Sequence, residues 1–263
     1  MLKLSHLDID KKRLEIGWCG PPPDEALTLV FLHEGLGCVE MWRDFPCKLS
    51  AATGCGALVY SRLGYGRSDA CSLPRPFSFM HDEGLHVLPK LLGRTEVKEC
   101  ILIGHSDGGS IAIIYGGGTP ALPLRGLITE AAHVFCEEIS IRSIRRAREN
   151  YIKGDLRKKL EKYHGRNTGC AFWGWNDAWL HPDFKHWNLE EYLPTIQVPV
   201  LAIQGEKDPY GSPAQLEAIV TQSAGKTESL LLPECGHAPH FDRSEATFEA
   251  LKDFILSRAD SQD

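Results

Sequence analysis

The sequence predicts a doubly wound, mostly parallel α/β sheet with a helical segment inserted into it. Six apolar runs of strand length recur along the 263 residues without polar alternation, and helix-like segments separate them. Such runs are typical of strands that a parallel sheet buries on both faces. Strands that alternate with helices indicate the doubly wound arrangement. With 43% hydrophobic and 24% charged residues, the chain can form a large core and is not of the disordered class.

The predicted elements follow one another regularly. An antiparallel hairpin at the sheet edge is expected first, from residues 3–8 and 14–18, because apolar and polar residues alternate there. The buried strands are predicted at 27–33, 57–62, 100–106, 124–129, 198–205 and 229–232. The helices between and after them are predicted at 39–52, 79–93, 108–115, 214–222 and 244–258.

Residues 136–197 interrupt this alternation, because they contain no predicted strand. Helices are expected at 138–152 and, behind an Asp155 cap, at 155–163. Roughly sixty residues are too many for a connecting loop, so we expect a helical cap at 136–197 on a core formed by 1–135 and 198–263. The cap holds four of the six tryptophans, which are expected both to pack it and to face a substrate.

Charge and hydropathy exclude several classes of function. The chain has 29 Lys and Arg against 35 Asp and Glu, a net charge of −6, which argues against a nucleic-acid partner. No run approaches the roughly 18 apolar residues of a membrane span, and the N-terminal residues do not resemble a signal peptide, so we expect a cytoplasmic protein that does not bind membranes. The nine cysteines match no metal-ligand spacing and are expected to be free thiols.

Ser106 is the predicted nucleophile. It lies in the motif GHSDGG at 104–109, between a predicted buried strand and a predicted helix, which is the setting that a G-x-S-x-G elbow requires. Small neighbours allow a tight strand-to-helix turn, and the helix N-terminus lies beneath the developing oxyanion. A phosphate-binding loop is excluded because no Gly-Lys-Ser or Gly-Lys-Thr follows.

A catalytic serine needs a base, and the base needs an orienting acid. Asp208 and His237 each follow a predicted strand, and the order serine, aspartate, histidine is the one expected for this elbow. Glu206 and Glu130 compete with Asp208 for the role of the acid. His240 competes with His237, but the Gly-His step favours His237 as the base.

Five ordered motifs give the chain its resemblance to the α/β-hydrolase family with a helical cap, and within it to the serine esterase and biphenyl-hydrolase-like branch. They are HEGLG at 33–37, SRLGYGRS at 61–68, GHSDGG at 104–109, QGEKD at 204–208 and CGHAPH at 235–240. The resemblance implies the α/β-hydrolase fold, a small-molecule ester or lactone as substrate, and no metal or organic cofactor. It also implies an oxyanion hole formed by the backbone N–H groups of Gly35 and Asp107.

The chain departs from the family pattern at charged positions. Glu34 stands where the family usually has glycine, and it is expected to be either a carboxylate beside the active site or a structural acid paired locally. Ser61 replaces the usual aspartate and leaves Arg62 without that neighbour. Asp107 stands where many relatives have an apolar residue, so that, together with Glu34, it could attract the α-amino group of an aminoacyl ester. The alternative is that Asp107 caps its own helix or bonds a basic residue.

Substrate access is assigned to the cap. Trp173, Trp175 and Trp179 are expected to roof an apolar pocket beside His133. Two rival functions share this fold: a C–C bond hydrolase of aromatic ring-cleavage products, and a non-catalytic receptor for a small ligand. The complete set of serine, aspartate and histidine argues against the receptor. The oligomeric state is not indicated by the sequence.

Overall fold

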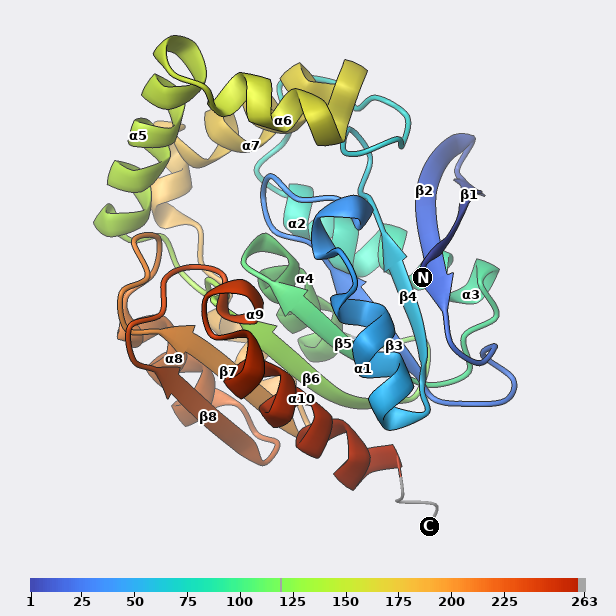
Figure 1. Cartoon of the computed structure of the whole chain (residues 1–263). Coiled ribbons are helices and arrows are strands. Elements are labelled where there is room, and N and C mark those ends of the chain that lie inside the picture. Colours follow the sequence, from blue (N-terminus) through green and yellow to red (C-terminus); the bar gives the residue numbers. More distant parts are fainter. Residues whose placement is uncertain (119, 260–263) are drawn as a thin grey trace.

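The computed structural model describes residues 1–118 and 120–259, and it contains an eight-stranded sheet (Figure 1). The strand order is β1-β2-β4-β3-β5-β6-β7-β8. The pairs β1/β2 and β2/β4 are antiparallel, and all later pairs are parallel. The strands are β1 (Lys3–Ile9), β2 (Lys12–Cys19), β3 (Thr28–Leu32), β4 (Gly56–Tyr60), β5 (Cys100–His105), β6 (Leu124–Glu130), β7 (Val200–Gly205) and β8 (Thr227–Leu232).

Helices connect the strands and cover both faces of the sheet. The α-helices are α1 (Phe45–Thr53), α2 (Phe79–Asp82), α3 (Leu88–Arg94), α4 (Asp107–Gly117), α5 (Glu138–Lys153), α6 (Leu156–His164), α7 (Thr168–Trp179), α8 (Pro213–Gln222), α9 (Pro239–Asp242) and α10 (Ser244–Ala259). Shorter 3₁₀ segments are η1 (Val39–Trp42), η3 (Gly165–Asn167), η4 (Pro182–His186) and η5 (Glu190–Thr195). A π-helical turn, η2 (Glu83–Val87), joins α2 to α3.

The central strands are apolar throughout because both of their faces are covered. In β3, Leu29 and Phe31 belong to one hydrophobic core, whereas Val30 and Leu32 belong to the other. The side chains of a strand alternate between its faces, so a run without polar residues is what two covered faces require. The predicted doubly wound, mostly parallel sheet is thereby confirmed, including its antiparallel edge hairpin.

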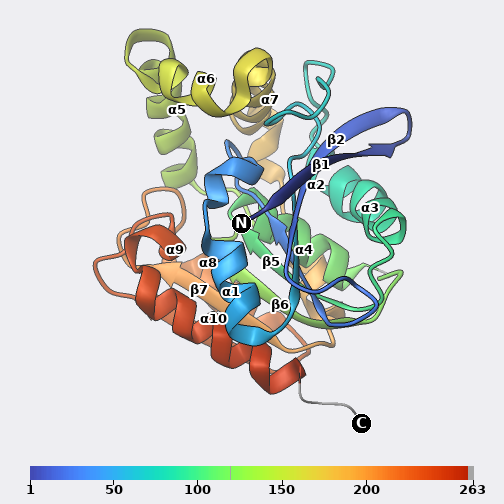
Figure 2. The same ribbon diagram turned by 45° about the vertical axis from the view of Figure 1, so that its right-hand side comes forward.

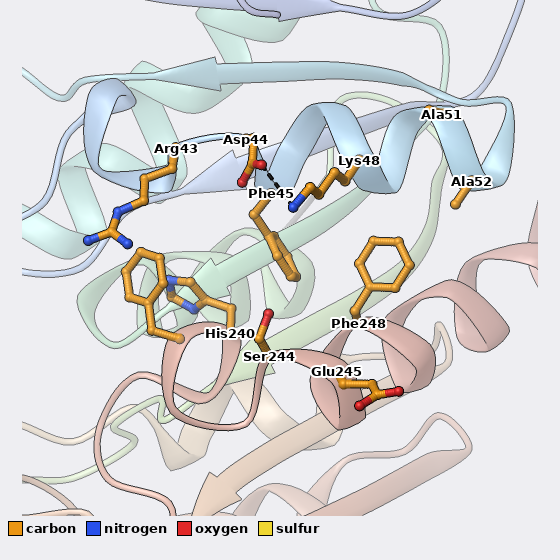
Figure 3. Close-up of a pocket in the computed structure, with 11 residues that line it drawn as sticks. Arg43, Asp44, Phe45, Lys48, Ala51, Ala52, His240, Ser244, Glu245 and Phe248 are labelled. Atoms are coloured by element: carbon orange, nitrogen blue, oxygen red, sulfur yellow. Dashed lines mark ion pairs between the residues drawn. The ribbon is translucent and has the colours of Figure 1, made fainter.

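Helices α1 and α10 lie side by side on one face of the sheet (Figure 1). A groove of about 840 Å³ runs between them. Figure 3 shows Phe45 of α1 and Phe248 of α10 in this groove. Their ring centroids are 6.1 Å apart. The opposite face is covered by α4, which contacts β3, β5 and β6, and by α8, which contacts β7 and β8.

Two predicted helices begin differently in the structure. The helix expected at 39–52 is divided into η1 and α1, because Arg43 between them has a φ of 54° and Pro46 lies in the first turn of α1. Asp155 is at the N-cap position of α6, but its side chain accepts no capping hydrogen bond. It forms an ion pair with Lys159 at 2.8 Å instead.

Residues 136–197 form a helical layer. They contain α5, α6 and α7 and the segments η3, η4 and η5, and Asn188 forms an isolated bridge with Phe135. In both views α5, α6 and α7 group together above the sheet (Figures 1 and 2). The division into a core and a cap at these boundaries stays a prediction. No helix in the described part of the chain has the length and apolarity needed to cross a membrane.

The expectation of nine free thiols is wrong for four of the cysteines. The structure joins Cys19 to Cys47 and Cys71 to Cys170, the second pair linking the loop after β4 to α7. The paired cysteines are 28 and 99 residues apart in sequence, so only the folding of the chain brings their Cα atoms within 5.7 and 6.6 Å. Disulfides are rare in reducing compartments, so these two pairs do not support the expected cytoplasmic location.

Candidate active site

Ser106 lies at a sharp turn between β5 and α4. Its φ of 52° and ψ of −119° place it in a region that non-glycine residues seldom occupy. A Cβ atom at Gly108 would lie 2.0 Å from the carbonyl oxygen of Leu32, so glycine is required for α4 to approach β3. The strained turn holds the hydroxyl of Ser106 above the N-terminus of α4.

The structure brings together the three residues predicted as the catalytic set. The Nε2 atom of His237 is 2.9 Å from Ser106 Oγ. On the other side of the ring, Nδ1 is 2.8 Å from Oδ2 of Asp208. The Asp208 carboxylate is fully buried, whereas the imidazole remains partly accessible. The His237 imidazole is therefore hydrogen-bonded to both partners and remains partly exposed.

The Asp208 carboxylate is held by two further donors that the sequence analysis did not identify. Gln204 of β7 donates from Nε2 to Oδ2 at 2.7 Å, and the backbone N–H of Tyr210 donates to Oδ1 at 2.8 Å. Burial acts to raise the pKa of Asp208, but the charge and hydrogen bonds of His237, aided by the Tyr210 N–H, lower it below its usual value. Tyr210 could have been found, since it lies two residues after the aspartate in the same turn.

The competing acids and the competing histidine lie elsewhere. Glu130 accepts a hydrogen bond at 2.7 Å from Nδ1 of His240, and both side chains are buried. Glu206 is exposed. Asp208 is thus the carboxylate that contacts His237, and His240 is paired with Glu130.

The two residues expected to donate to the oxyanion border Ser106. Asp107 is the first residue of α4, and Gly35 lines the same cavity as Ser106. A Cβ atom at Gly35 would lie 2.3 Å from Nε1 of Trp175, so this position has no room for a side chain. Within residues 1–118 and 120–259, the N–H group of Gly35 donates to no backbone acceptor, and that of Asp107 donates to none outside α4. Both groups remain able to bind a ligand oxygen.

Glu34 satisfies both of its predicted descriptions. It lines the cavity, and its Oε2 lies 3.6 Å from Nδ1 of the buried His105. Burial acts to lower the pKa of His105, but pairing with Glu34 raises it to about 9, so the imidazole carries a positive charge at neutral pH. The Nε2 of His105 donates to the carbonyl oxygen of His237 at 2.6 Å. His105 thus joins the Glu34 loop to His237, a contact that no sequence signal indicated.

A cavity of about 100 Å³ adjoins Ser106 and His237. All five residues predicted to bind substrate line it: Glu34, Asp107, His133, Trp175 and Trp179. Four further residues, which were not predicted to bind substrate, also line it: Leu36, Ser140, Ile144 and Tyr210. Ser140 and Ile144 are four residues apart on the buried face of α5, so helical periodicity could have indicated them.

The tryptophans divide between the two uses that were expected of them. Trp175 and Trp179 line the cavity, whereas Trp187 stacks on Phe184 with a centroid separation of 5.4 Å. Trp173 was also expected over the pocket. It packs instead against Tyr151, at a centroid distance of 5.4 Å.

Two buried polar groups in the cavity wall have unsatisfied atoms. Among the described residues, neither carboxylate oxygen of Asp107 has a hydrogen-bond partner, and Nδ1 of His133 has none either. Burial raises the pKa of Asp107, while the Arg62 guanidinium and the nearby Trp179 indole act in the opposite direction. Burial, with the nearby His237, lowers the pKa of His133 to about 4, so its ring is neutral.

A family model described as the Alpha/beta hydrolase family matches residues 29–250. The chain belongs to this family. The match confirms the family predicted from the five motifs and, with the topology of the sheet, the α/β-hydrolase fold.

Individual relatives share less than 30% of their residues with this alpha/beta hydrolase over the matched segments. Serine hydrolase BPHL of Mus musculus is 27% identical over 197 residues, which cover 73% of this chain and 66% of the relative. The sn-1-specific diacylglycerol lipase ABHD11 of Danio rerio is 28% identical over 106 residues, 40% of this chain and 32% of that protein. The chain therefore spans less than two thirds of the length of either curated relative. BPHL supports the biphenyl-hydrolase-like branch at low identity.

A solved esterase structure shares the fold. The esterase from Exiguobacterium antarcticum superimposes with a TM-score of 0.74 over 94% of this chain and 97% of its own, at 19% identity. At this identity the likeness establishes the fold alone.

Proposed function

We propose that this alpha/beta hydrolase cleaves carboxylic esters or lactones through an acyl-enzyme on Ser106. The observation that carries the proposal is the hydrogen-bonded series from Ser106 Oγ to His237 Nε2, at 2.9 Å, and from Nδ1 to Asp208, at 2.8 Å. This geometry provides a nucleophile, a general base and an orienting acid in contact.

In the first half of the reaction, Ser106 Oγ attacks the ester carbonyl and transfers its proton to Nε2 of His237. Asp208 accepts a hydrogen bond from Nδ1 and stabilises the imidazolium that forms. The N–H groups of Gly35 and Asp107 receive the negative charge on the former carbonyl oxygen. When the tetrahedral intermediate collapses, the bond to the leaving oxygen breaks, and His237 protonates the departing alcohol.

In the second half, water replaces the alcohol. His237 accepts a proton from water as its oxygen attacks the acyl carbonyl, and the same two N–H groups receive the oxyanion. Cleavage of the bond to Ser106 Oγ returns the proton to the serine and releases the carboxylic acid. The partly accessible His237 ring can serve both halves, since it borders the cavity in which either the alcohol or water would lie.

The size of the cavity favours a compact acyl group. Its volume of about 100 Å³ is well below the roughly 300–1,000 Å³ of common ligand pockets. An acetyl or aminoacyl group fits this space better than an aromatic ring-cleavage product does. The volume therefore supports ester or lactone cleavage over the rival C–C bond hydrolysis.

The buried carboxylate of Asp107 favours an α-amino group on the substrate. Neither of its oxygens meets the geometric criteria for a hydrogen bond with a described residue, so the side chain does not cap its own helix. The Arg62 guanidinium and the Trp179 indole, which act against the effect of burial on its pKa, are its polar neighbours. A substrate ammonium group would supply the missing hydrogen bonds and, with Glu34 nearby, oppose the effect of burial on the Asp107 pKa. Opposite charges about 4 Å apart attract by about 4 kcal/mol at an effective dielectric of about 20, before desolvation is subtracted.

Covalent labelling tests the proposed nucleophile. A fluorophosphonate is expected to modify Ser106 in the native protein, and modification should be lost in Ser106→Ala and strongly slowed in His237→Ala. Glu206→Gln is the control, since it changes an exposed carboxylate of the same turn as Asp208. Equal labelling of native protein and His237→Ala would contradict the proposed base.

A pair of substrates tests the preference for an amino group. An α-aminoacyl ester is expected to exceed its des-amino analogue about tenfold in kcat/KM, a difference of about 1.4 kcal/mol. Asp107→Asn keeps the backbone N–H but removes the charge, so it should abolish the preference while retaining turnover of the des-amino ester. A preference that persists in Asp107→Asn would assign the carboxylate a structural role.

A further inference from the structure

Arg62 is a buried cation that the proposed reaction does not use. Only 1% of the residue is exposed, and its guanidinium packs 5.0 Å from the ring centroid of Tyr65. Its Nη1 donates to the carbonyl oxygen of His33, and its Nη2 donates to that of Glu34 at 2.9 Å. Burying a guanidinium is costly unless its N–H groups are paired, so these contacts fix the position of the loop that follows β3.

His33 provides a second donor to the same oxygen. Its Nε2 accepts the backbone N–H of Arg62 at 3.1 Å, so in the neutral ring the proton resides on Nδ1. Burial, together with the adjacent guanidinium, holds the pKa of His33 well below its usual value and keeps the ring neutral. The protonated Nδ1 then donates to the Glu34 carbonyl at 2.7 Å. The Glu34 oxygen is thus held by two side chains.

The Glu34 carbonyl and the Gly35 N–H belong to one planar peptide group. In a trans peptide these two bonds point in opposite directions, and within the described residues the only cis bond is Leu73–Pro74. Donors that hold the oxygen on one side therefore direct the N–H to the other side. Gly35 lines the cavity at Ser106, so this other side is the one at which the substrate carbonyl would bind.

We infer that Arg62, together with His33, sets the orientation of the Glu34–Gly35 peptide so that its N–H faces the oxyanion, which makes Arg62 a positioning residue of the oxyanion hole. The inference rests on the proposed serine esterase function and names a residue that this function does not include. It also gives a role to the motif SRLGYGRS.

The neighbouring residue of that motif holds the other end of the loop. Ser61 Oγ accepts the backbone N–H of Val39 at 2.9 Å and donates to Glu15 at 2.7 Å. Consecutive residues at the end of β4 therefore fix the loop near its start and near its end. Gly35 lies between these two attachments.

An oxygen-to-sulfur exchange in the substrate tests this role. A thionoester replaces the carbonyl oxygen by sulfur, which accepts hydrogen bonds poorly, so its cleavage depends little on the oxyanion hole. Arg62→Lys keeps the charge but loses the paired N–H groups. It is expected to lower kcat for the oxoester about 30-fold, with KM changed less than about threefold, and to lower kcat for the matching thionoester less than about threefold. Arg62→Gln should show the same pattern if the lysine variant folds poorly.

Arg75 provides the matched control. It lies in the same region, its Nη2 donates to the carbonyl oxygen of Leu63 at 2.7 Å, and its guanidinium packs 4.7 Å from the ring centroid of Tyr65. Arg75→Lys removes a comparable contact without touching the Glu34–Gly35 peptide. It should leave the oxoester-to-thionoester ratio unchanged, and thermal unfolding of each variant reports any loss of structure.

The outcomes separate the two proposals. If both substrates slow equally in the Arg62 variants, or if Arg75→Lys reproduces the selective loss, Arg62 is structural and the inference is overturned while the function stands. Turnover of native protein that survives in Ser106→Ala would overturn the proposed function and the inference with it.

Discussion

Among the described residues, two carboxylate–imidazole pairs have nearly equal geometry, but only one of them contacts Ser106. Asp208 and His237 are 2.8 Å apart in the loops after β7 and β8. Glu130 and His240 are 2.7 Å apart at the end of β6 and in α9. The ring of His105 lies between the pairs, 5.2 Å from that of His237 and 5.0 Å from that of His240.

The surroundings of the two imidazoles differ. His237 borders the cavity and contacts Ser106, whereas His240 packs against Trp42, at a centroid distance of 4.8 Å, and against Phe45, at 5.6 Å. Figure 3 shows His240 beside Phe45 at the groove near α1. The two acid–histidine pairs therefore differ in what their rings reach rather than in their own geometry. A histidine proposed as a general base must reach both a nucleophile and a ligand, and of these two rings only His237 contacts Ser106 and lines the cavity.

The largest expected difference between the pairs is in turnover. Asp208→Asn should lower kcat for an ester by about 10⁴-fold, because an amide stabilises neither the required tautomer nor the imidazolium. Glu130→Gln should stay within about tenfold of native protein at a temperature at which it is folded. Steady-state kinetics measures both effects, with Glu206→Gln as the exposed control. A greater loss in Glu130→Gln than in Asp208→Asn would move the catalytic acid to β6.

The order should reverse when stability is measured. Glu130→Gln leaves a fully buried imidazole without its charged partner, and breaking such a pair costs about 3 kcal/mol of the free energy of unfolding. Asp208→Asn should cost less, because Gln204 and the Tyr210 N–H still meet an oxygen at that position and His237 is partly exposed. Urea denaturation of the two variants decides the point. Equal destabilisation would show that the two pairs contribute alike to the fold.

The smallest expected difference between the two pairs is in how the free energy of unfolding depends on pH. Burial acts to raise the pKa of Glu130, but the charge and hydrogen bonds of His240 lower it below its usual value. A carboxyl whose pKa is lowered by folding contributes stability above its unfolded pKa, and this contribution is lost as the pH falls through the folded pKa. The stability difference between native protein and Glu130→Gln should therefore be constant above the unfolded pKa of about 4.3 and shrink as the pH falls below it, through the lower folded pKa. A difference that stays constant there as well would show that Glu130 is not charged in the native protein.

The most accurate predictions from the sequence concern features that depend on a local pattern of residues. The strands β3, β4, β5 and β7 lie within two residues of their predicted bounds because apolar runs mark burial on both faces. The expected start at 198 moves to Val200, which follows Pro199, a residue without an N–H for the ladder. Ser106, Asp208 and His237 lie together because each follows a strand that ends at the same edge of the sheet, and their catalytic roles stay a prediction.

Contacts between distant segments had no comparable signal. Three contacts each join residues 28 or more positions apart. They are the Cys71–Cys170 disulfide, the pairing of Glu34 with His105, and the hydrogen bond from Arg62 to the carbonyl oxygen of Glu34. Such contacts depend on how loops approach one another above the sheet, which spacing and periodicity do not encode. The division of the tryptophans between cavity and packing has the same origin.

The close approach of Trp175 to Gly35 has a consequence for how this site can evolve. A methyl group at position 35 would lie 2.3 Å from the indole of Trp175. The residues at positions 35 and 175 therefore cannot be substituted independently of each other. A larger residue at 35 becomes admissible only after the side chain at 175 has been reduced, and the effects of the two substitutions are then non-additive. Alanine at 35 should therefore be found among descendants of this sequence only where the indole has already been lost, so the order in which the two changes arise is constrained.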